Sequence, residues 1–235
     1  MSILSIIIPV YNEANTIYPV LKIINNVTLI NNIKKEIIII NDCSTDNSEN
    51  LIFDFMSKSK DANIKYFKQN RNTGKGAAIK TGISKATGNY LIIQDADLEY
   101  DPNDYNVLLE PIINGHADVV YGSRFKNKPS NTMFFWQKTG NKVLTFISNL
   151  FTKFDLSDME TCYKLFKTEQ IKSLHLHENG FGFEPEITAK LSKIPDITIR
   201  EVGVSFNCRT KKEGKKIRFK DGLRALYCIV NYWIK

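Results

Sequence analysis

The sequence predicts an α/β fold built on a mostly parallel sheet with helices on both faces. Apolar, strand-like runs alternate along the first half of the chain with longer segments of helical periodicity, which is typical of β-α-β units. The run Ile37–Ile40 is continuously apolar, as a strand covered on both faces requires. A chain of 235 residues, 43% hydrophobic and 24% charged, is long enough to form one sizeable core.

The expected strands are short apolar runs bounded by turn-forming residues. They cover Ser5–Pro9, Glu36–Asn41, Ile64–Phe67, Tyr90–Gln94 and Val119–Gly122. The expected helices cover Ile17–Asn26, Asp46–Ser57, Gly74–Ala86 and Asp104–Ile113, with Asp46 and Asn72 or Thr73 as caps near their starts. We expect residues 1–208 to form one domain and residues 209–235 to form a basic loop followed by a helix.

Three acids follow the expected strand at Tyr90–Gln94. Asp95, Asp97 and Glu99 are spaced two apart, so on an extended backbone their side chains point to one face. Carboxylate ligands without His or Cys suit a hard cation, Mg²⁺ or Mn²⁺. The alternative interpretation is an acidic turn that closes a buried strand and faces solvent.

Polar segments also follow the first two expected strands, at Pro9–Glu13 and Asp42–Asn47. Ligands of open α/β sheets bind beyond the carboxyl ends of the strands, so these segments and the acidic triplet should share one crevice. Taken alone, Asp42–Asn47 reads as an ordinary turn. Beside Tyr11 and the triplet, Asp42 becomes a candidate acceptor for the N–H edge of a nucleotide base.

Cysteine and histidine patterns exclude several kinds of site. The four cysteines lie far apart, at Cys43, Cys162, Cys208 and Cys228. This spacing indicates neither a zinc site nor a disulfide framework and fits a cytoplasmic protein with reduced thiols. His175 and His177 lack accompanying ligands, so we expect them to be surface or core residues. We find no signal peptide and no run near the roughly 18 apolar residues of a membrane span, so we expect a soluble or peripheral protein.

The net charge of +7 is concentrated near the carboxyl end. Residues 209–220 contain seven Lys or Arg and one Glu, a net charge of 7 − 1 = +6. Such a run is either a solvated face or a site for phosphate, nucleic acid or anionic lipid. Apolar residues then recur at helical spacing at Leu223, Leu226, Tyr227, Val230 and Ile234. This helix either closes the core or lies on a membrane surface.

Several motifs together carry a family resemblance. They are Pro9-x-Tyr11-Asn12-Glu13, Asp42 within Asn-Asp-x-Ser-x-Asp, Asn72-x-Gly74-Lys75-Gly76, Asp95-Ala96-Asp97-Leu98 and Gly122-Ser123-Arg124. In order and spacing they resemble family 2 glycosyltransferases of the GT-A fold. The chain looks most like the dolichyl- or polyprenyl-phosphate hexosyltransferases through Asp158–Lys164, Gly182–Glu186 and Arg209–Ile217, and the resemblance covers nearly the whole chain. It implies inverting transfer of a hexose from a UDP- or GDP-sugar to a polyprenyl or dolichyl phosphate, in the making of a cell-envelope glycan.

The resemblance also implies roles for individual residues. The donor-binding residues would be Pro9, Tyr11, Glu13, Ile40, Asp42, Lys75, Asp95 and Ala96, with Ile40 against the base. Asp95, Asp97 and Glu99 would hold Mg²⁺ or Mn²⁺, with Asp97 the most important of the three. Arg124 would face phosphate, and Arg209 and Lys215 match positions that grip donor or acceptor phosphates. Two positions depart from the family: Glu99 replaces a common Gln, and Asn207-Cys208 stands where a Gly commonly precedes the Arg.

The nature of the acceptor decides whether a general base is needed. A phosphate monoester has a second pKa of about 6 and is largely dianionic near neutrality, so a lipid phosphate needs no base. A sugar hydroxyl needs one, and Asp158 and Glu160 are the candidates. The alternative is that these two acids form a turn that leads into a strand at Thr161–Phe166. The basic run favours a lipid phosphate, reached by peripheral contact with the inner face of a membrane. The family resembled here also includes enzymes that have carboxyl-terminal membrane spans, which this sequence lacks.

Other functions are also compatible with parts of the sequence. One is a family 2 glycosyltransferase that acts on a sugar hydroxyl of a cell-surface glycan. A nucleotidyltransferase would carry a glycine- and arginine-rich loop where this chain has Pro9–Glu13. A nucleic-acid-binding module would explain the basic run but not the acidic crevice, so we expect no nucleic-acid partner. A noncatalytic scaffold would not need every expected acid to be present.

Overall fold

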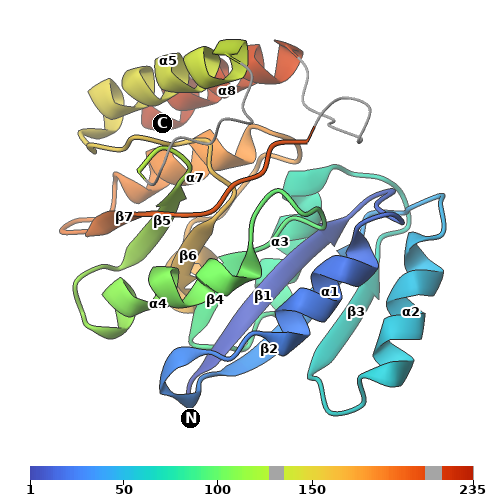
Figure 1. The fold of residues 1–235 in the computed structure, drawn as a ribbon. Helices are drawn as coiled ribbons and strands as arrows, with labels where there is room; N and C mark the ends of the chain where they lie inside the picture. Colours follow the sequence, from blue (N-terminus) through green and yellow to red (C-terminus); the bar gives the residue numbers. More distant parts are fainter. Residues whose placement is uncertain (127–134, 210–218, 235) are drawn as a thin grey trace.

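The computed structural model describes residues 1–126, 135–209 and 219–234, and it contains a seven-stranded sheet between two layers of helices (Figure 1). The strands are β1 (Ile3–Val10), β2 (Lys34–Asn41), β3 (Ile64–Lys68), β4 (Tyr90–Ile93), β5 (Val119–Ser123), β6 (Lys164–Lys167) and β7 (Ile199–Gly203). The helices are α1 (Ile17–Asn26), α2 (Ser48–Lys58), α3 (Lys75–Lys85), α4 (Tyr105–Ile113), α5 (Phe135–Thr152), α6 (Thr168–Ser173), α7 (Phe183–Leu191) and α8 (Phe219–Ile234). Short 3₁₀ turns cover Ile30–Asn32 and Pro102–Asp104. The predicted α/β class is confirmed.

The strand order brings distant parts of the chain to one edge of the sheet. The strands lie in the order β3-β2-β1-β4-β6-β5-β7, and β6 runs antiparallel to both of its neighbours while the other pairs are parallel. The carboxyl ends of β1, β2, β4 and β5 therefore meet the start of β6. Residues that precede β6 are thus placed beside residues that follow β4 and β5.

The two faces of the sheet form two hydrophobic clusters because side chains alternate along each strand. Ile6 and Ile8 of β1 pack on one face with α1, α2 and α4, whereas Ile7 packs on the other face with α3, α6 and α7. Fully burying one such side chain contributes about 1.5–3 kcal/mol. Helices α5 and α8 lie side by side over α7 as an outer layer (Figure 1). Across the described residues, no helix combines the length and apolar character needed to cross a bilayer.

The predicted elements of the first half agree with the structure within two residues at each end. Helix α1 has the predicted bounds. Asp46 contributes at the start of α2, because its carboxylate accepts the Ser48 N–H at 3.0 Å. The expected side-chain cap of α3 by Asn72 or Thr73 is wrong. That helix starts after Gly74, whose φ of 98° falls in the region that favours glycine, and no side-chain cap bond is made.

A buried carboxylate ties four segments together at the amino ends of the strands. Glu36 of β2 is 1% exposed and accepts hydrogen bonds from Ser5 of β1 at 2.5 Å and from the Thr87 hydroxyl at 2.6 Å. It also accepts one from Lys65 of β3 at 2.5 Å. Burial alone would raise the pKa of Glu36, but these bonds outweigh it and lower the pKa to about 2.

We predict that Glu36→Gln lowers the free energy of unfolding by about 2 kcal/mol at neutral pH, because a charged acceptor of several bonds is lost. The folded-state pKa lies below the ordinary value of 4.5, so the contribution is present above pH 4.5 and is lost as pH falls towards 2. The difference between wild type and variant should therefore narrow over that window. Urea unfolding at several pH values measures it. The exposed Glu110→Gln is the matched control, and an equal loss there would contradict the assignment.

Candidate active site

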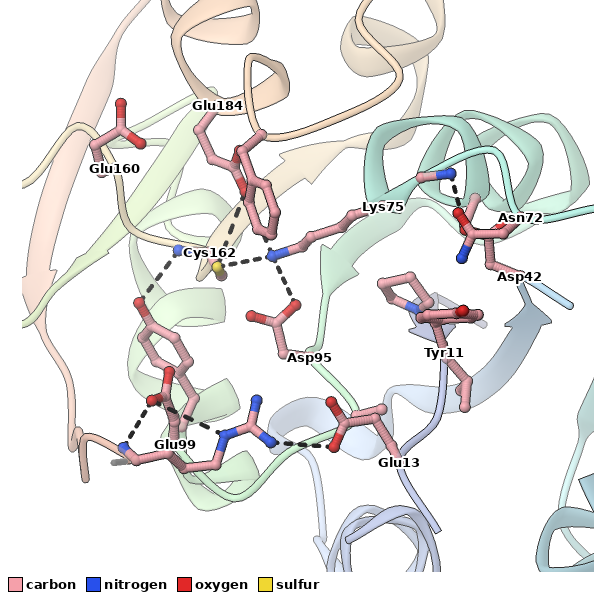
Figure 2. Close-up of a pocket in the computed structure, with 18 of the residues that line it drawn as sticks. Tyr11, Glu13, Asp42, Asn72, Lys75, Asp95, Glu99, Glu160, Cys162 and Glu184 are labelled. Atoms are coloured by element: carbon pink, nitrogen blue, oxygen red, sulfur yellow. Dashed lines mark hydrogen bonds and ion pairs between the residues drawn. The ribbon is translucent and has the colours of Figure 1, made fainter. Parts of the chain in front are cut away.

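A pocket of about 320 Å³ opens where the carboxyl ends of β1, β2 and β4 meet (Figure 2). Most of the residues predicted to bind the donor, the metal or phosphate line it: Pro9, Tyr11, Glu13, Asp42, Lys75, Asp95, Ala96, Glu99, Arg124 and Arg209. Its volume is in the range of small-molecule sites. The crevice expected from the polar strand ends is therefore present.

Lys75 lies at the centre of the first charged cluster. Its Nζ is 2.8 Å from Asp95 Oδ1, 3.0 Å from Cys162 Sγ and 3.5 Å from Glu184 Oε1. Figure 2 shows the side chain reaching between Asp95 and Glu184. Burial alone would lower the pKa of Lys75, but Asp95, Cys162 and Glu184 raise it well above its ordinary value. Lys75 is therefore a cation that holds one carboxylate from each half of the chain, Asp95 after β4 and Glu184 on α7.

Arg209 organises the second charged cluster. Its guanidinium is 2.5 Å from Asp97 Oδ2 and 3.1 Å from Glu13 Oε2, and its backbone N–H donates to Glu99 at 2.7 Å. Asp97 is 5% exposed and lies behind the pocket lining. In this structure the predicted phosphate-binding Arg209 thus lies on the predicted metal-binding acids.

The acids after β4 have the donor chemistry of a divalent-cation site. Burial and the charge of Asp95 raise the pKa of Asp97 to about 7, with Arg209 acting against this and Glu99 adding to it. In the part of the chain that the structure describes, no three such side chains already surround a common metal position. Carboxylate oxygens suit Mg²⁺ or Mn²⁺. Lys75 contacts Asp95 and Arg209 contacts Asp97, so each of these acids has a positively charged partner in the structure.

Asp42 has a role that the sequence did not reveal. One carboxylate oxygen accepts the Thr73 N–H at 2.8 Å and the other accepts the Gly74 N–H at 2.8 Å. Asp42 therefore fixes the loop that starts α3 and so positions Lys75. A carboxylate has about four acceptor positions, so Asp42 keeps capacity for a further donor.

Arg124 lines the far end of the pocket and is anchored by Asp158. Arg124 Nε and Nη2 each donate to a different Asp158 oxygen at 2.7 Å, and the Arg124 backbone N–H donates to the same carboxylate at 3.0 Å. Asn141 of α5 adds a bond of 2.7 Å. Asp158 is fully buried; burial alone would raise its pKa, but Arg124 lowers it below the ordinary value. Asp158 is thus a fixed anion that orients Arg124.

Glu160 lines the same end of the pocket, away from Lys75 (Figure 2). One of its oxygens is buried and lacks a hydrogen-bond partner among the described residues. Burial and the charge of Glu184 raise the pKa of Glu160 to about 8. The carboxyl group is therefore mainly protonated at neutral pH.

Three predicted site residues that the structure describes do not line the pocket: Asp97 and Asp158 are buried behind it, and Ile40 lies in the core. Ile40 is fully buried in the core with Ala78 of α3 and does not line the pocket, and Lys215 lies outside the described residues. The structure adds Glu184, Cys162 and Phe181 to the lining. Cys162 and Glu184 lie in motifs that carried the family resemblance, so the signal was present without a role attached to it.

Comparison with known proteins agrees with these features. Residues 5–174 match the profile described as Glycosyl transferase family 2. A dolichyl-phosphate beta-glucosyltransferase of Dictyostelium discoideum is 29% identical over 91% of this chain and 68% of its own length. A dolichol-phosphate mannosyltransferase of Pyrococcus furiosus is 26% identical over 97% of this chain and 64% of its own length. This chain therefore spans about two thirds of each relative.

Solved structures share the fold at low sequence identity. Glucosyl-3-phosphoglycerate synthase from Mycobacterium tuberculosis, in complex with Mn²⁺, UDP and phosphoglyceric acid, superposes with a TM-score of 0.71 at 16% identity, covering 99% of this chain and 78% of that one. A mannosyltransferase from Pyrobaculum calidifontis, in complex with GDP-Man and Mn²⁺, gives 0.66 at 15% identity, covering 97% and 69%. The matched profile spans most of the sheet and the acids at its edge, and the chain belongs to glycosyl transferase family 2.

Proposed function

We propose that this protein transfers a hexose, with inversion, from a UDP- or GDP-sugar to a polyprenyl or dolichyl phosphate at the inner face of a membrane. The observation that carries the proposal is the end of the pocket formed by Arg124 and Glu160. It offers a buried, oriented guanidinium and lacks a competent base at either predicted position. The names of the relatives support the same acceptor class.

The two carboxylates that a sugar hydroxyl would need as bases are both unsuited to the task. Asp158 is buried with both oxygens bonded to Arg124, and its lowered pKa makes it a weak proton acceptor. Burial and the charge of Glu184 raise the pKa of Glu160 to about 8, so this carboxyl is mainly protonated at neutral pH and is a poor base. A phosphate acceptor carries its own nucleophilic oxygen, so neither residue has to remove a proton. A planar, charged guanidinium suits phosphate oxygens.

The opposite end of the pocket suits the donor. Pro9, Tyr11 and Asp42 provide an aromatic surface and a carboxylate for the nucleoside. Asp95, Asp97 and Glu99 would hold a divalent cation, which supplies charge stabilisation to the diphosphate leaving group. Two solved neighbours in complex with Mn²⁺ support this assignment. Lys75 and Arg209 lie where they can compensate phosphate charge once the acids bind a cation.

The reaction follows from this division of the pocket. An oxygen of the lipid phosphate attacks the anomeric carbon from the side opposite the diphosphate, the carbon–oxygen bond to the diphosphate breaks, and the nucleoside diphosphate leaves. Arg124 orients the attacking phosphate, while the groups after β4 stabilise the charge that grows on the departing one. Interactions that strengthen as the bond breaks lower the barrier.

The proposed function is tested by incubating the protein with Mg²⁺ or Mn²⁺, labelled UDP-glucose or GDP-mannose, and one of three acceptors. The acceptors are polyprenyl phosphate, phosphoglyceric acid and a neutral oligosaccharide. Label should enter the organic phase with polyprenyl phosphate. Transfer only to the oligosaccharide or only to phosphoglyceric acid would show that the acceptor assignment is wrong.

We predict that Asp97→Asn lowers transfer by about 100-fold or more while the protein stays folded, because a ligand of the proposed cation is lost. The transfer rate and calorimetric Mn²⁺ binding should both fall. Asp61→Asn, at an exposed position, is the matched control. Wild-type turnover in Asp97→Asn would contradict the assignment of Asp97 as a ligand of the cation.

We predict that Asp158→Asn raises the KM for the lipid phosphate about tenfold and leaves the shape of the pH–rate profile unchanged, because Arg124 loses an ionic anchor. A general base would behave differently: its removal would lower kcat sharply and abolish the acidic limb of the profile. Steady-state kinetics across pH separates the two roles.

We predict that the KM for the acceptor rises as pH passes through about 8, since Glu160 then ionises and repels a dianionic phosphate. Glu160 is neutral below its raised pKa, so acceptor binding should be strongest on the neutral side. The Glu160→Gln variant should lose this dependence. If the KM for the acceptor rose equally in the wild type and in Glu160→Gln, another group would be responsible and the prediction would be wrong.

A further inference from the structure

We propose that α5 and α8 together form a docking face for an anionic lipid bilayer. Exposed apolar side chains are concentrated there: thirteen large hydrophobic residues are exposed among the described residues, and nine of these lie on the two helices. The nine are Trp136, Val143, Phe146, Leu150, Leu223, Leu226, Tyr227, Trp233 and Ile234. The inference rests on the proposed function only in one respect: a lipid-phosphate acceptor explains why the protein would need to reach a bilayer. The surface itself and its test involve no sugar transfer.

Helix α5 differs from an ordinary surface helix in carrying a line of buried polar side chains and an exposed apolar side. The buried polar line consists of Asn141, Thr145, Ser148 and Thr152, spaced four, three and four residues apart. Beside it, Leu144, Ile147 and Phe151 pack, partly buried, against the core. Bonds to the protein satisfy the polar line; for example, the Met159 N–H donates to the Thr145 hydroxyl at 3.1 Å. Phe146 and Leu150 on the other side are 63% and 65% exposed. The outer side is therefore the one suited to an apolar phase.

Helix α8 has separate buried and exposed apolar sides. Ala225, Cys228 and Ile229 are at most 2% exposed, whereas Leu223 is 57% exposed and Tyr227 is 52% exposed. The buried side already closes the core, so the exposed apolar side chains are additional to that role. Both readings of the helix offered by the sequence can therefore hold at once.

The two helices contact each other. Phe151 of α5, which also packs against the core, and Trp233 of α8 have ring centroids 5.0 Å apart. Figure 1 shows the two helices side by side in the outer layer, running in the same direction. Because each helix turns its buried side towards the core, the exposed sides face away from the sheet together.

Charge on these helices favours an anionic bilayer over a second copy of the chain. The α5 sequence contains Lys138 and Lys142 and no acid, and the exposed Lys153 and Asp155 follow it. The single acid in the α8 sequence is Asp221, next to the exposed Lys220. Two such faces would repel each other, whereas each basic residue is attracted to anionic lipid by about 1 kcal/mol. Exposed Trp and Tyr side chains also suit the bilayer interface.

The test measures binding of the full chain to vesicles without donor or acceptor, so failure of the proposed transfer reaction would not affect it. Vesicles contain phosphatidylcholine alone or with about 30% phosphatidylglycerol, since surface charge is the variable to be tested. The wild type should pellet with the anionic vesicles, and raised salt should weaken binding because it screens the lysines. Absence of binding to both kinds of vesicle would overturn the proposal.

Variants identify the surface. The double variant Phe146→Glu/Leu150→Glu, and separately Leu226→Glu on α8, should lower the partition coefficient at least tenfold, by about 1.4 kcal/mol. Val107→Glu on α4, at a side chain 43% exposed, is the matched control and should bind as the wild type does. Circular dichroism checks folding, and the two helices provide independent variants. An equal loss of vesicle binding in Val107→Glu would overturn the proposal. It would also be overturned if the wild type formed dimers that the double variant does not form, and bound no vesicles.

Discussion

The site depends on positive charge placed between carboxylates that would otherwise repel each other in a poorly solvated pocket. Lys75 holds Asp95 of the first half of the chain and Glu184 of the second, and Arg209 holds Asp97 and Glu13. A buried charge without a partner costs several kcal/mol, so these acids can gather only with cations among them. The same requirement suits the edge of the sheet to a divalent cation and a diphosphate together. The cation would replace Lys75 and Arg209 as the partner of the acids, and these two side chains could then pair with the diphosphate.

The sequence predicted the first half of the fold closely because its signals are local. An Ile-rich strand followed by a helical period carries its own assignment, so β1 to β5 and α1 to α4 lie within two residues of their predicted bounds. The run Thr161–Phe166 is also typical of a strand, and β6 begins within it, but a local signal does not give its place in the sheet. Its antiparallel place between β4 and β5 is decided by partners more than 40 residues earlier in the chain. That placement brings Cys162 to Lys75, and spacing along the chain could not reveal it.

The candidate site shows the same division. Residue types at strand ends identified much of the pocket lining, since Tyr11, Asp42 and Asp95 follow strands whose ends must meet. Their partners could not be deduced, because Arg209 and Asp97 are 112 residues apart and meet through the folding of the second half. Ile40 illustrates the limit of a resemblance. It lies two residues before Asp42, yet it is fully buried in the core cluster beneath α3, so proximity in sequence did not place it in the pocket.

Helix α5 contributes both to the pocket and to the proposed bilayer-binding surface. Its buried polar line contributes Asn141 to the Asp158 carboxylate, which in turn fixes Arg124 in the pocket. Its outer side carries the exposed Phe146 and Leu150. A helix with only apolar residues on its buried side would leave Asp158 without that donor. The buried polar residues of α5 therefore have a physical reason, because one of them holds the anchor of Arg124. The apolar residues of the helix are divided between the core, where Ile147 and Phe151 pack, and the surface.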